Sequence, residues 1–225
     1  MNYGQIKERV CRNVGRNFTE FNDDVAQIVK DVIRQDICGS RNYWFMQQEY
    51  EEFQTVDGVA ASDLPVDFKD ELGFWYHETD TNSYIPLDPI SERGYKDRYA
   101  SDDEGEPEVY LLRPTELVIG PTPDDAYPIV GIYYSYLDVF DSDDDENFLT
   151  INYPELVIAL STARAFLRLQ EPQEATPWMQ MVYDPKNGMM IGLNRSATLR
   201  ELAGEVVLSP RAAVKGPEQS ERFQE

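Results

Sequence analysis

The residue types that most often do chemistry are sparse in this sequence of 225 residues. His77 is the only histidine, and its aromatic neighbours at residues 74–76 favour a strand position over a catalytic base. The sequence contains no glycine-rich phosphate loop, CxxC pair or HExxH motif. We therefore expect a protein that is not an enzyme and has no catalytic residues.

The densest group of potential metal ligands is the acidic run that ends at Glu146. Asp141, Asp143 and Asp145 match the first three ligand positions of a calcium-binding loop. Glu146 stands where that loop needs a glycine, and Asn152 stands where it needs a bidentate glutamate. We therefore expect a solvated connection with no metal or cofactor site. The alternative is a metal-dependent hydrolase that uses this acidic loop.

The charge balance limits the kinds of partner that the chain can bind. Lysine and arginine number 20 and aspartate and glutamate 42, so the formal net charge is −22. Such a surface repels phosphate at long range, which argues against a conventional DNA- or RNA-binding module. The charge fits either a plain acidic protein or a wall past which DNA slides without specific binding, and it does not choose between them. No apolar stretch approaches the roughly 18 residues of a membrane helix, and residues 1–10 do not resemble a signal peptide. We expect a soluble protein with no membrane partner.

The cysteines and the aromatic residues are expected in the core rather than in a binding site. Cys11 and Cys38 fall on expected helices and predict two small buried residues in a reducing compartment. A bridge between them requires the two helices to pair. A base-stacking platform normally accompanies a basic groove, so core packing is also predicted for Trp44, Phe45, Trp75, Tyr76, Tyr133, Tyr134 and Tyr136.

Helical patterns occur at both ends of the chain. Apolar residues at helical spacing over residues 3–14 predict a helix that ends near Gly15. Asn22 is expected to cap a second helix, which stops at Gly39. Near the other end, Pro154 is expected in the first turn of a helix that Pro172 ends. Asn152 or Tyr153 is its expected cap, and residues 174–193 are expected to be helical with an interruption at 184–188.

Strand patterns occur only between these helical regions. The runs 109–113 and 116–120 predict a hairpin, and the alternation of residues over 129–136 predicts a third strand. Together they indicate a β-meander over residues 107–136. Further strands are expected at 47–56, 71–78 and 83–87, with a short helix at 89–99.

We therefore predict an α+β fold in which helices from both ends form one bundle. The expected bundle comprises residues 1–42 and 150–192, with an inserted antiparallel β-lobe at 43–149. An extended C-terminal arm is expected at 193–225. This arm is either a frayed end or a segment that orders on a neighbouring subunit or partner. It mixes apolar and basic residues, namely Leu193, Arg195, Leu199, Arg200, Leu202, Val206, Val207 and Leu208.

The order of these features resembles the head-to-tail adaptor (neck) proteins of tailed bacteriophages, which include tail tubular A-type proteins and gene-transfer-agent adaptors. The resemblance covers residues 1 to about 193. Besides the two N-terminal helices, it depends on the aromatic run 43–46, the loop 64–68, the strand segments 106–112, 117–127 and 130–136, and the helix start at 154–163.

This resemblance implies a structural virion protein that is made in the host cytoplasm and located in the neck between capsid and tail. It implies a dodecameric ring that binds the portal protein on one side and a tail or nozzle protein on the other, and that lines the DNA exit channel. By analogy, the arm from Leu193 to Val214 would reach the portal. A tail-tip or receptor-binding component is a further alternative.

Overall fold

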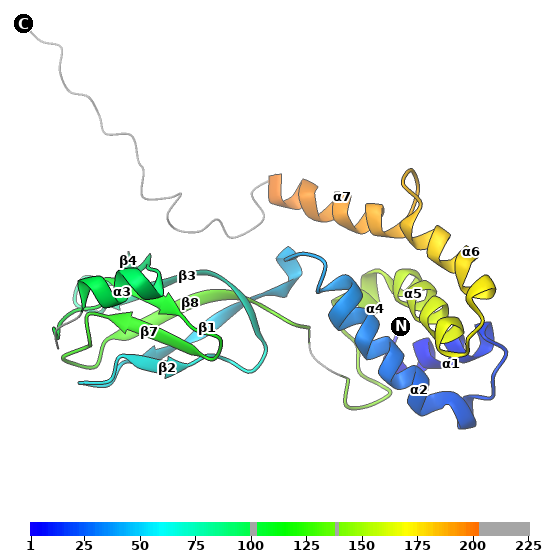
Figure 1. Ribbon diagram of the computed structural model, residues 1–225, viewed down its shortest axis with the longest axis horizontal. Helices are drawn as coiled ribbons and strands as arrows, with labels where there is room; N and C mark the ends of the chain where they lie inside the picture. Colours follow the sequence, from blue (N-terminus) through cyan, green and yellow to red (C-terminus); the bar gives the residue numbers. More distant parts are fainter. Residues whose placement is uncertain (100–102, 138–139, 203–225) are drawn as a thin grey trace, which may run out of the picture. The chain divides into compact units, whose positions relative to one another are not determined.

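The computed structural model describes residues 1–99, 103–137 and 140–202. The chain divides into two compact units, which Figure 1 shows in the colours of the sequence. The described residues of Met1–Met46 and Tyr136–Val206 form one unit, here called the helical unit. Residues Gln47–Ser135, here called the β unit, contain all the strands of the described residues. The predicted α+β class is confirmed.

The N-terminal part of the helical unit begins close to its predicted position. α1 opens with a capping box, in which the Asn2 side chain accepts a hydrogen bond from the Gln5 backbone and the Gln5 side chain accepts one from the Asn2 backbone. The helical segments here are α1 (Tyr3–Asn13), α2 (Phe18–Asp31) and the π-helical η1 (Val32–Ile37).

The predicted start of the second helix at Asn22 is wrong. α2 begins four residues earlier, because the Asn17 side chain accepts a hydrogen bond from the Thr19 backbone N–H and caps the helix. The buried stripe of α2 also starts earlier than expected, at Phe21. Gly39 follows the helical segments as predicted. A Cβ there would lie 2.2 Å from the Gln35 carbonyl oxygen, so only glycine fits.

The C-terminal part of the helical unit contains the central helix of this unit, α5. α5 packs against α1, α2 and α6, and ten of its residues are buried. Within the described residues, no helix has the length and apolar character needed to cross a membrane. The helices are α4 (Phe148–Asn152), α5 (Pro154–Arg168), α6 (Pro172–Tyr183) and α7 (Met189–Leu202).

Several details of these helices differ from the predictions. Asn152 does not cap α5, because it is the last residue of α4, a helix that was not predicted. Tyr153 stands at the cap position of α5 but makes no side-chain capping bond, while Pro154 takes the first turn as expected. Pro172 begins α6 as well as following α5. The predicted interruption at 184–188 is confirmed, since it separates α6 from α7.

The β unit is built from two four-stranded sheets and one short helix. One sheet has the order β1-β8-β3-β4 and the other β2-β7-β6-β5. Pairing is antiparallel except between β5 and β6. The elements are β1 (Gln47–Gln54), β2 (Ala61–Asp63), β3 (Phe68–Glu78), β4 (Ser83–Pro86), β5 (Asp88–Pro89), α3 (Glu92–Arg98), β6 (Val109–Leu112), β7 (Glu116–Gly120) and β8 (Pro128–Ser135).

The predicted β-meander is wrong in its third strand. β6 and β7 pair as the expected hairpin, but β8 lies in the other sheet between β1 and β3. The connection contains Pro121 and Pro123, which cannot donate hydrogen bonds to a ladder. The alternation within β8 is confirmed, with one face fully buried and the other half-buried. Alternation reports burial of a strand but does not identify the strands beside it.

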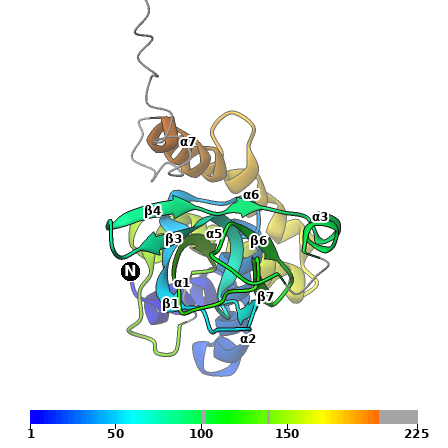
Figure 2. The same cartoon turned by 90° about the vertical axis from the view of Figure 1, so that its left-hand side faces the viewer.

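Aromatic and aliphatic side chains from both sheets fill the core of the β unit. A Cβ at Gly131 would lie 2.6 Å from the Phe74 ring, so this glycine makes room for the aromatic side chain. α3 lies at the edge of the β unit (Figure 2), and its Tyr95 hydroxyl donates to the Ile119 carbonyl at 3.0 Å. The buried cluster comprises Phe74, Tyr76, Leu87, Tyr110, Leu117, Ile119 and Ile129.

Candidate functional site

The acidic run that follows the β unit contacts the first helix of the chain. An Asp143 carboxylate oxygen lies 2.6 Å from the Lys7 ammonium, and the Asp143 carbonyl accepts a hydrogen bond from the Gly4 N–H at 2.8 Å. The Lys7 side chain is only 5% exposed, whereas that of Asp143 is 61% exposed. Asp143 therefore neutralises a cation that is almost removed from solvent.

Asp145 closes the turn within the same run. Its carboxylate accepts hydrogen bonds from the backbone N–H groups of Asp141 and Ser142, at 2.7 and 2.8 Å. These two bonds favour the charged form and lower the pKa of Asp145. Among the described residues, no three histidine, cysteine or acidic side chains come together as a metal site. Asp143 and Asp145 of the calcium-loop pattern thus have separate structural roles.

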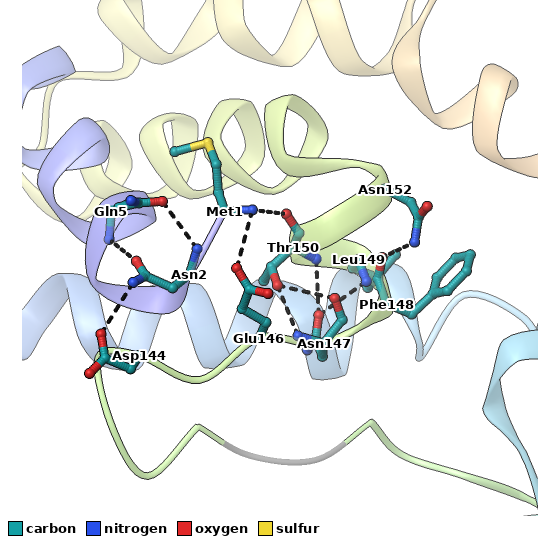
Figure 3. A network of polar contacts seen from close by, with 10 residues as sticks. All are labelled: Met1, Asn2, Gln5, Asp144, Glu146, Asn147, Phe148, Leu149, Thr150 and Asn152. Atoms are coloured by element: carbon teal, nitrogen blue, oxygen red, sulfur yellow. Dashed lines mark hydrogen bonds and ion pairs between the residues drawn. The ribbon is translucent and has the colours of Figure 1, made fainter.

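The N-terminus is bound to the same segment, as Figure 3 shows. The Met1 ammonium donates to the Thr150 carbonyl at 3.2 Å and lies 3.6 Å from a Glu146 carboxylate oxygen. The Asn2 side-chain amide donates to the Asp144 carboxylate at 3.4 Å. The acidic run is therefore an internal clamp between the start of the chain and α4.

Tyr3 completes the contacts of this clamp. Its hydroxyl donates to the Ala26 carbonyl in α2 at 2.8 Å, and its ring stacks on Phe140 with centroids 4.5 Å apart. Burial, together with the nearby charge of Asp143, raises the pKa of Tyr3 to about 12. The phenol is therefore neutral at physiological pH and serves as a structural hydrogen-bond donor.

His77 is a strand residue of β3, as predicted. Its Nε2 lies 3.1 Å from the Asn82 side-chain oxygen, and its ring stacks on Tyr84 with centroids 4.5 Å apart. Both partners belong to the β3–β4 hairpin or its turn. The geometry supports a role in holding this hairpin together.

The aromatic residues considered as a stacking platform belong to two separate groups. In the β unit, Trp75, Tyr76 and Tyr133 are at most 8% exposed. In the helical unit, Trp44 and Phe45 pack against Phe148, with ring centroids 5.2 and 4.3 Å apart. Most of this aromatic surface is therefore used in packing.

The predicted C-terminal binding residues lie largely on α7. Residues 193–202 are helical rather than extended, which corrects the predicted start of the arm at Leu193. Leu193 and Ala197 are each 1% exposed and continue a buried stripe from Met190. This spacing of three and four residues was the missed sequence signal for the helix. Of the other predicted residues, Val206, Val207 and Leu208 lie outside the described part of the chain.

Polar contacts hold the C-terminal half of α7 against the segment that leads into β1. Arg41 binds both carboxylate oxygens of Glu201, at 2.6 and 2.7 Å. The buried Tyr43 hydroxyl donates to the Asn194 side chain at 2.9 Å. The Arg200 guanidinium lies over the Trp44 ring, 4.3 Å from its centroid. These contacts leave Arg195 and Leu199 exposed, with Leu199 at 60%.

An open groove of about 820 Å³ runs along α6 and was not predicted from the sequence. It begins beside Leu167 at the end of α5 and extends to Pro185 in the turn before α7. Leu167 and Tyr183 are each 48% exposed at this groove. The groove and the exposed face of α7 are the candidate interaction surfaces of the helical unit.

A model of the family described as SU10 adaptor protein matches residues 1–202. The match spans both compact units and ends with α7. No curated protein matches the chain in sequence. The predicted likeness to a phage adaptor is confirmed for the family, while the tail tubular A-like or gene-transfer-agent-like subtype stays a prediction. The chain therefore belongs to the SU10 adaptor protein family, a structural class of phage proteins that interact with other head and tail proteins of the virion.

Proposed function

We propose that this chain is a head-to-tail adaptor that assembles as a ring, with twelve copies by analogy, between the portal and the tail. The observation that carries the proposal is the family match over residues 1–202, because it includes both compact units. An adaptor has to bind one partner on each side. Two units with different surfaces provide two separate binding regions.

The portal contact is assigned to the exposed face of α7. Arg195 and Leu199 lie on this face, and Leu199 is 60% exposed. An exposed apolar side chain beside an arginine is typical of protein interfaces, where arginine is enriched. The α7 backbone is held in place by the Arg41–Glu201 and Tyr43–Asn194 contacts. The surface is therefore ordered before it binds.

The distribution of charge supports a passage for DNA. Residues 47–135 contain 21 acidic and 5 basic residues, a formal charge of −16 out of the −22 of the whole chain. Carboxylates along a channel repel the phosphate backbone and prevent it from adhering. At physiological salt this repulsion acts over about 8 Å, so it affects DNA close to the wall. We propose that the β unit contributes to this wall.

Electron microscopy of the purified protein mixed with the portal of the same phage tests the proposal. The expected result is a ring of additional density on the tail side of the portal, while the isolated chain is monomeric or weakly associated. The double variant Arg195→Glu with Leu199→Asp should lose this density, because it places charge in the contact.

Ile151→Asp serves as the matched control, since Ile151 is 55% exposed on α4 rather than on α7. It should attach to the portal as the unmodified chain does. A stable dimer that ignores the portal, or portal binding that the α7 variant leaves intact, would contradict the proposal. Binding to the host surface in place of the portal would favour a receptor-binding component.

A further inference from the structure

The α6 groove has the chemistry of a protein-binding site in an otherwise acidic molecule. Glu174 is the only charged residue among the 12 residues of α6. The groove is lined mainly by uncharged side chains, including Leu167, Pro172, Thr176, Met179, Tyr183 and Pro185. Exposed apolar surface of this kind marks an interaction site when it is contiguous.

One end of the groove carries a fixed negative charge. Asp184 lines the groove, and its carboxylate accepts hydrogen bonds from the backbone N–H groups of Lys186 and Asn187, both at 2.8 Å. These bonds lower the pKa of Asp184 and keep it ionised. A fitting occupant is therefore an apolar segment with a cation shortly beyond it.

The end of the chain contains such a segment. Residues 203–225 follow α7, and Val206, Val207 and Leu208 are three consecutive apolar residues within them. Arg211 follows three residues later and supplies the cation. We propose that Val206, Val207 and Leu208 bind in the α6 groove of a neighbouring copy of this chain. This neighbour is the adjacent copy in the proposed ring, so the inference rests on the proposed function.

The length of the chain favours a neighbour over the same copy. Fully extended backbone covers at most about 3.6 Å per residue, so Leu208, the farthest of the three, reaches at most about 22 Å beyond Leu202. α7 itself, with 14 residues, is about 20 Å long, and the groove lies on α6 before Met189. Figure 1 shows α7 continuing onward from α6. The three apolar residues therefore cannot reach the middle of their own groove.

Such an exchange joins two different surfaces of identical chains. Contacts of this heterologous type close into a ring when the rotation between copies permits it. Because Val206, Val207 and Leu208 then bind a neighbouring copy, they are not part of the portal contact, which is left to α7.

A labelled peptide of residues 203–214 tests the groove directly. The acceptor is the full chain carrying Val207→Asp, which disables its own segment, and binding is followed by fluorescence anisotropy. We expect saturable binding that Thr176→Glu in the acceptor weakens at least tenfold, because Thr176 is exposed and lines the groove. Tyr183→Ala should also weaken binding, and provides a second variant without added charge.

Met181→Glu is the matched control, since Met181 is 44% exposed on the same helix but does not line the groove. This variant should bind the peptide as the acceptor does. A peptide that fails to bind, or that binds the Thr176, Tyr183 and Met181 variants equally, would overturn the inference. Far-ultraviolet circular dichroism confirms that each acceptor is folded.

A cysteine pair distinguishes exchange between copies from binding within one copy. A chain carrying Thr176→Cys and Val207→Cys should form covalent oligomers on oxidation, while its native Cys11 and Cys38 stay buried. Oxidised monomers alone would overturn the neighbour assignment. Neither experiment uses the portal. A chain that binds the portal but not the peptide therefore refutes this inference alone, and the reverse result refutes the proposed portal contact alone.

Discussion

The helical unit and the β unit use charged side chains in different ways. In the helical unit, ion pairs join segments from opposite ends of the chain, namely Lys7–Asp143, Arg9–Glu155, Arg16–Glu171, Asp24–Arg168, Asp36–Arg164 and Arg41–Glu201. In the β unit, the ion pairs between described residues join positions at most 21 apart, as in Arg113–Glu92 and Arg98–Glu108. The first pattern connects the chain ends, and the second reinforces local structure.

The difference follows from how each unit is assembled. The helical unit brings together segments separated by about a hundred residues, so side-chain pairs specify which faces meet. The β unit is contiguous, and its hairpins form from neighbouring segments. With 21 acidic and only 5 basic residues, it has few cations to pair, and many of its carboxylates face solvent. Substitutions in the two units should therefore have separable effects on stability.

The largest expected effect comes from truncating a core leucine in each unit. Leu160→Ala in α5 and Leu117→Ala in β7 should each lower the free energy of unfolding by about 2–5 kcal/mol, because both leucines are at most 1% exposed. Denaturant titrations can follow Trp44 and Trp178 for the helical unit and Trp75 for the β unit. Each variant should shift only the transition of its own unit. A common shift of all three signals would show that the units unfold together.

The next effect concerns the clamp on the N-terminal helix. Asp143→Asn should lower the free energy of unfolding of the helical unit by about 1–3 kcal/mol, because it leaves the buried Lys7 ammonium unpaired. Asp144→Asn is the control, since that carboxylate makes only an exposed 3.4 Å contact to Asn2. Adding Lys7→Met to Asp143→Asn should recover part of the loss. No recovery would mean that the Lys7 charge is not the cause.

A smaller effect should appear at alkaline pH. The pKa of Tyr3 is raised from 10.0 to about 12. The free energy of folding that the neutral Tyr3 hydroxyl contributes is therefore fully present below about pH 10 and is lost as pH rises through 12. Tyr127 in the β unit reaches about 12 mainly because its hydroxyl donates to Asp124 at 2.6 Å. Asp124→Asn should therefore lower the pKa of Tyr127 and leave that of Tyr3 unchanged, as measured by phenolate absorbance. An equal change in the pKa of both tyrosines would contradict the assignment of different causes to the two raised pKa values.

The smallest effect is expected at the exposed ion pairs of the helical unit. Glu155→Gln should cost only about 0.2–1 kcal/mol, because the Arg9 and Glu155 side chains are 44% and 57% exposed. The loss should shrink further at high salt, where such pairs are screened. Thermal unfolding at two salt concentrations measures it. A loss that is larger than that of Asp143→Asn would reverse the assignment of the clamp as the principal charged contact.

Local patterns predicted most elements but not their neighbours. The apolar spacing over residues 3–14 and the alternation over 129–136 located α1 and β8 because each pattern reflects one buried face. The same alternation could not place β8 between β1 and β3, since those partners are distant in sequence. Asn17 was overlooked as a cap because Asn22 stands closer to the apolar run.

The candidate surfaces were less predictable than the elements. The acidic run matched three positions of a calcium loop, yet its side chains bind α1, the N-terminus and their own backbone. Leu193 and Leu199 looked alike in the sequence, but one is buried and the other is 60% exposed. The α6 groove was missed because it combines residues from α5, α6 and the following turn.

The class of fold, the order of helical and strand segments, and the acidic character of residues 47–135 could all be predicted from the amino-acid sequence. These properties depend on side chains within a few residues of one another, or on composition alone. Three further features became visible only in the folded chain: Asp143 neutralises Lys7, β8 lies in the sheet of β1 and β3, and α6 borders an open groove. Each of these depends on which distant segments meet, and packing of the whole chain settles that.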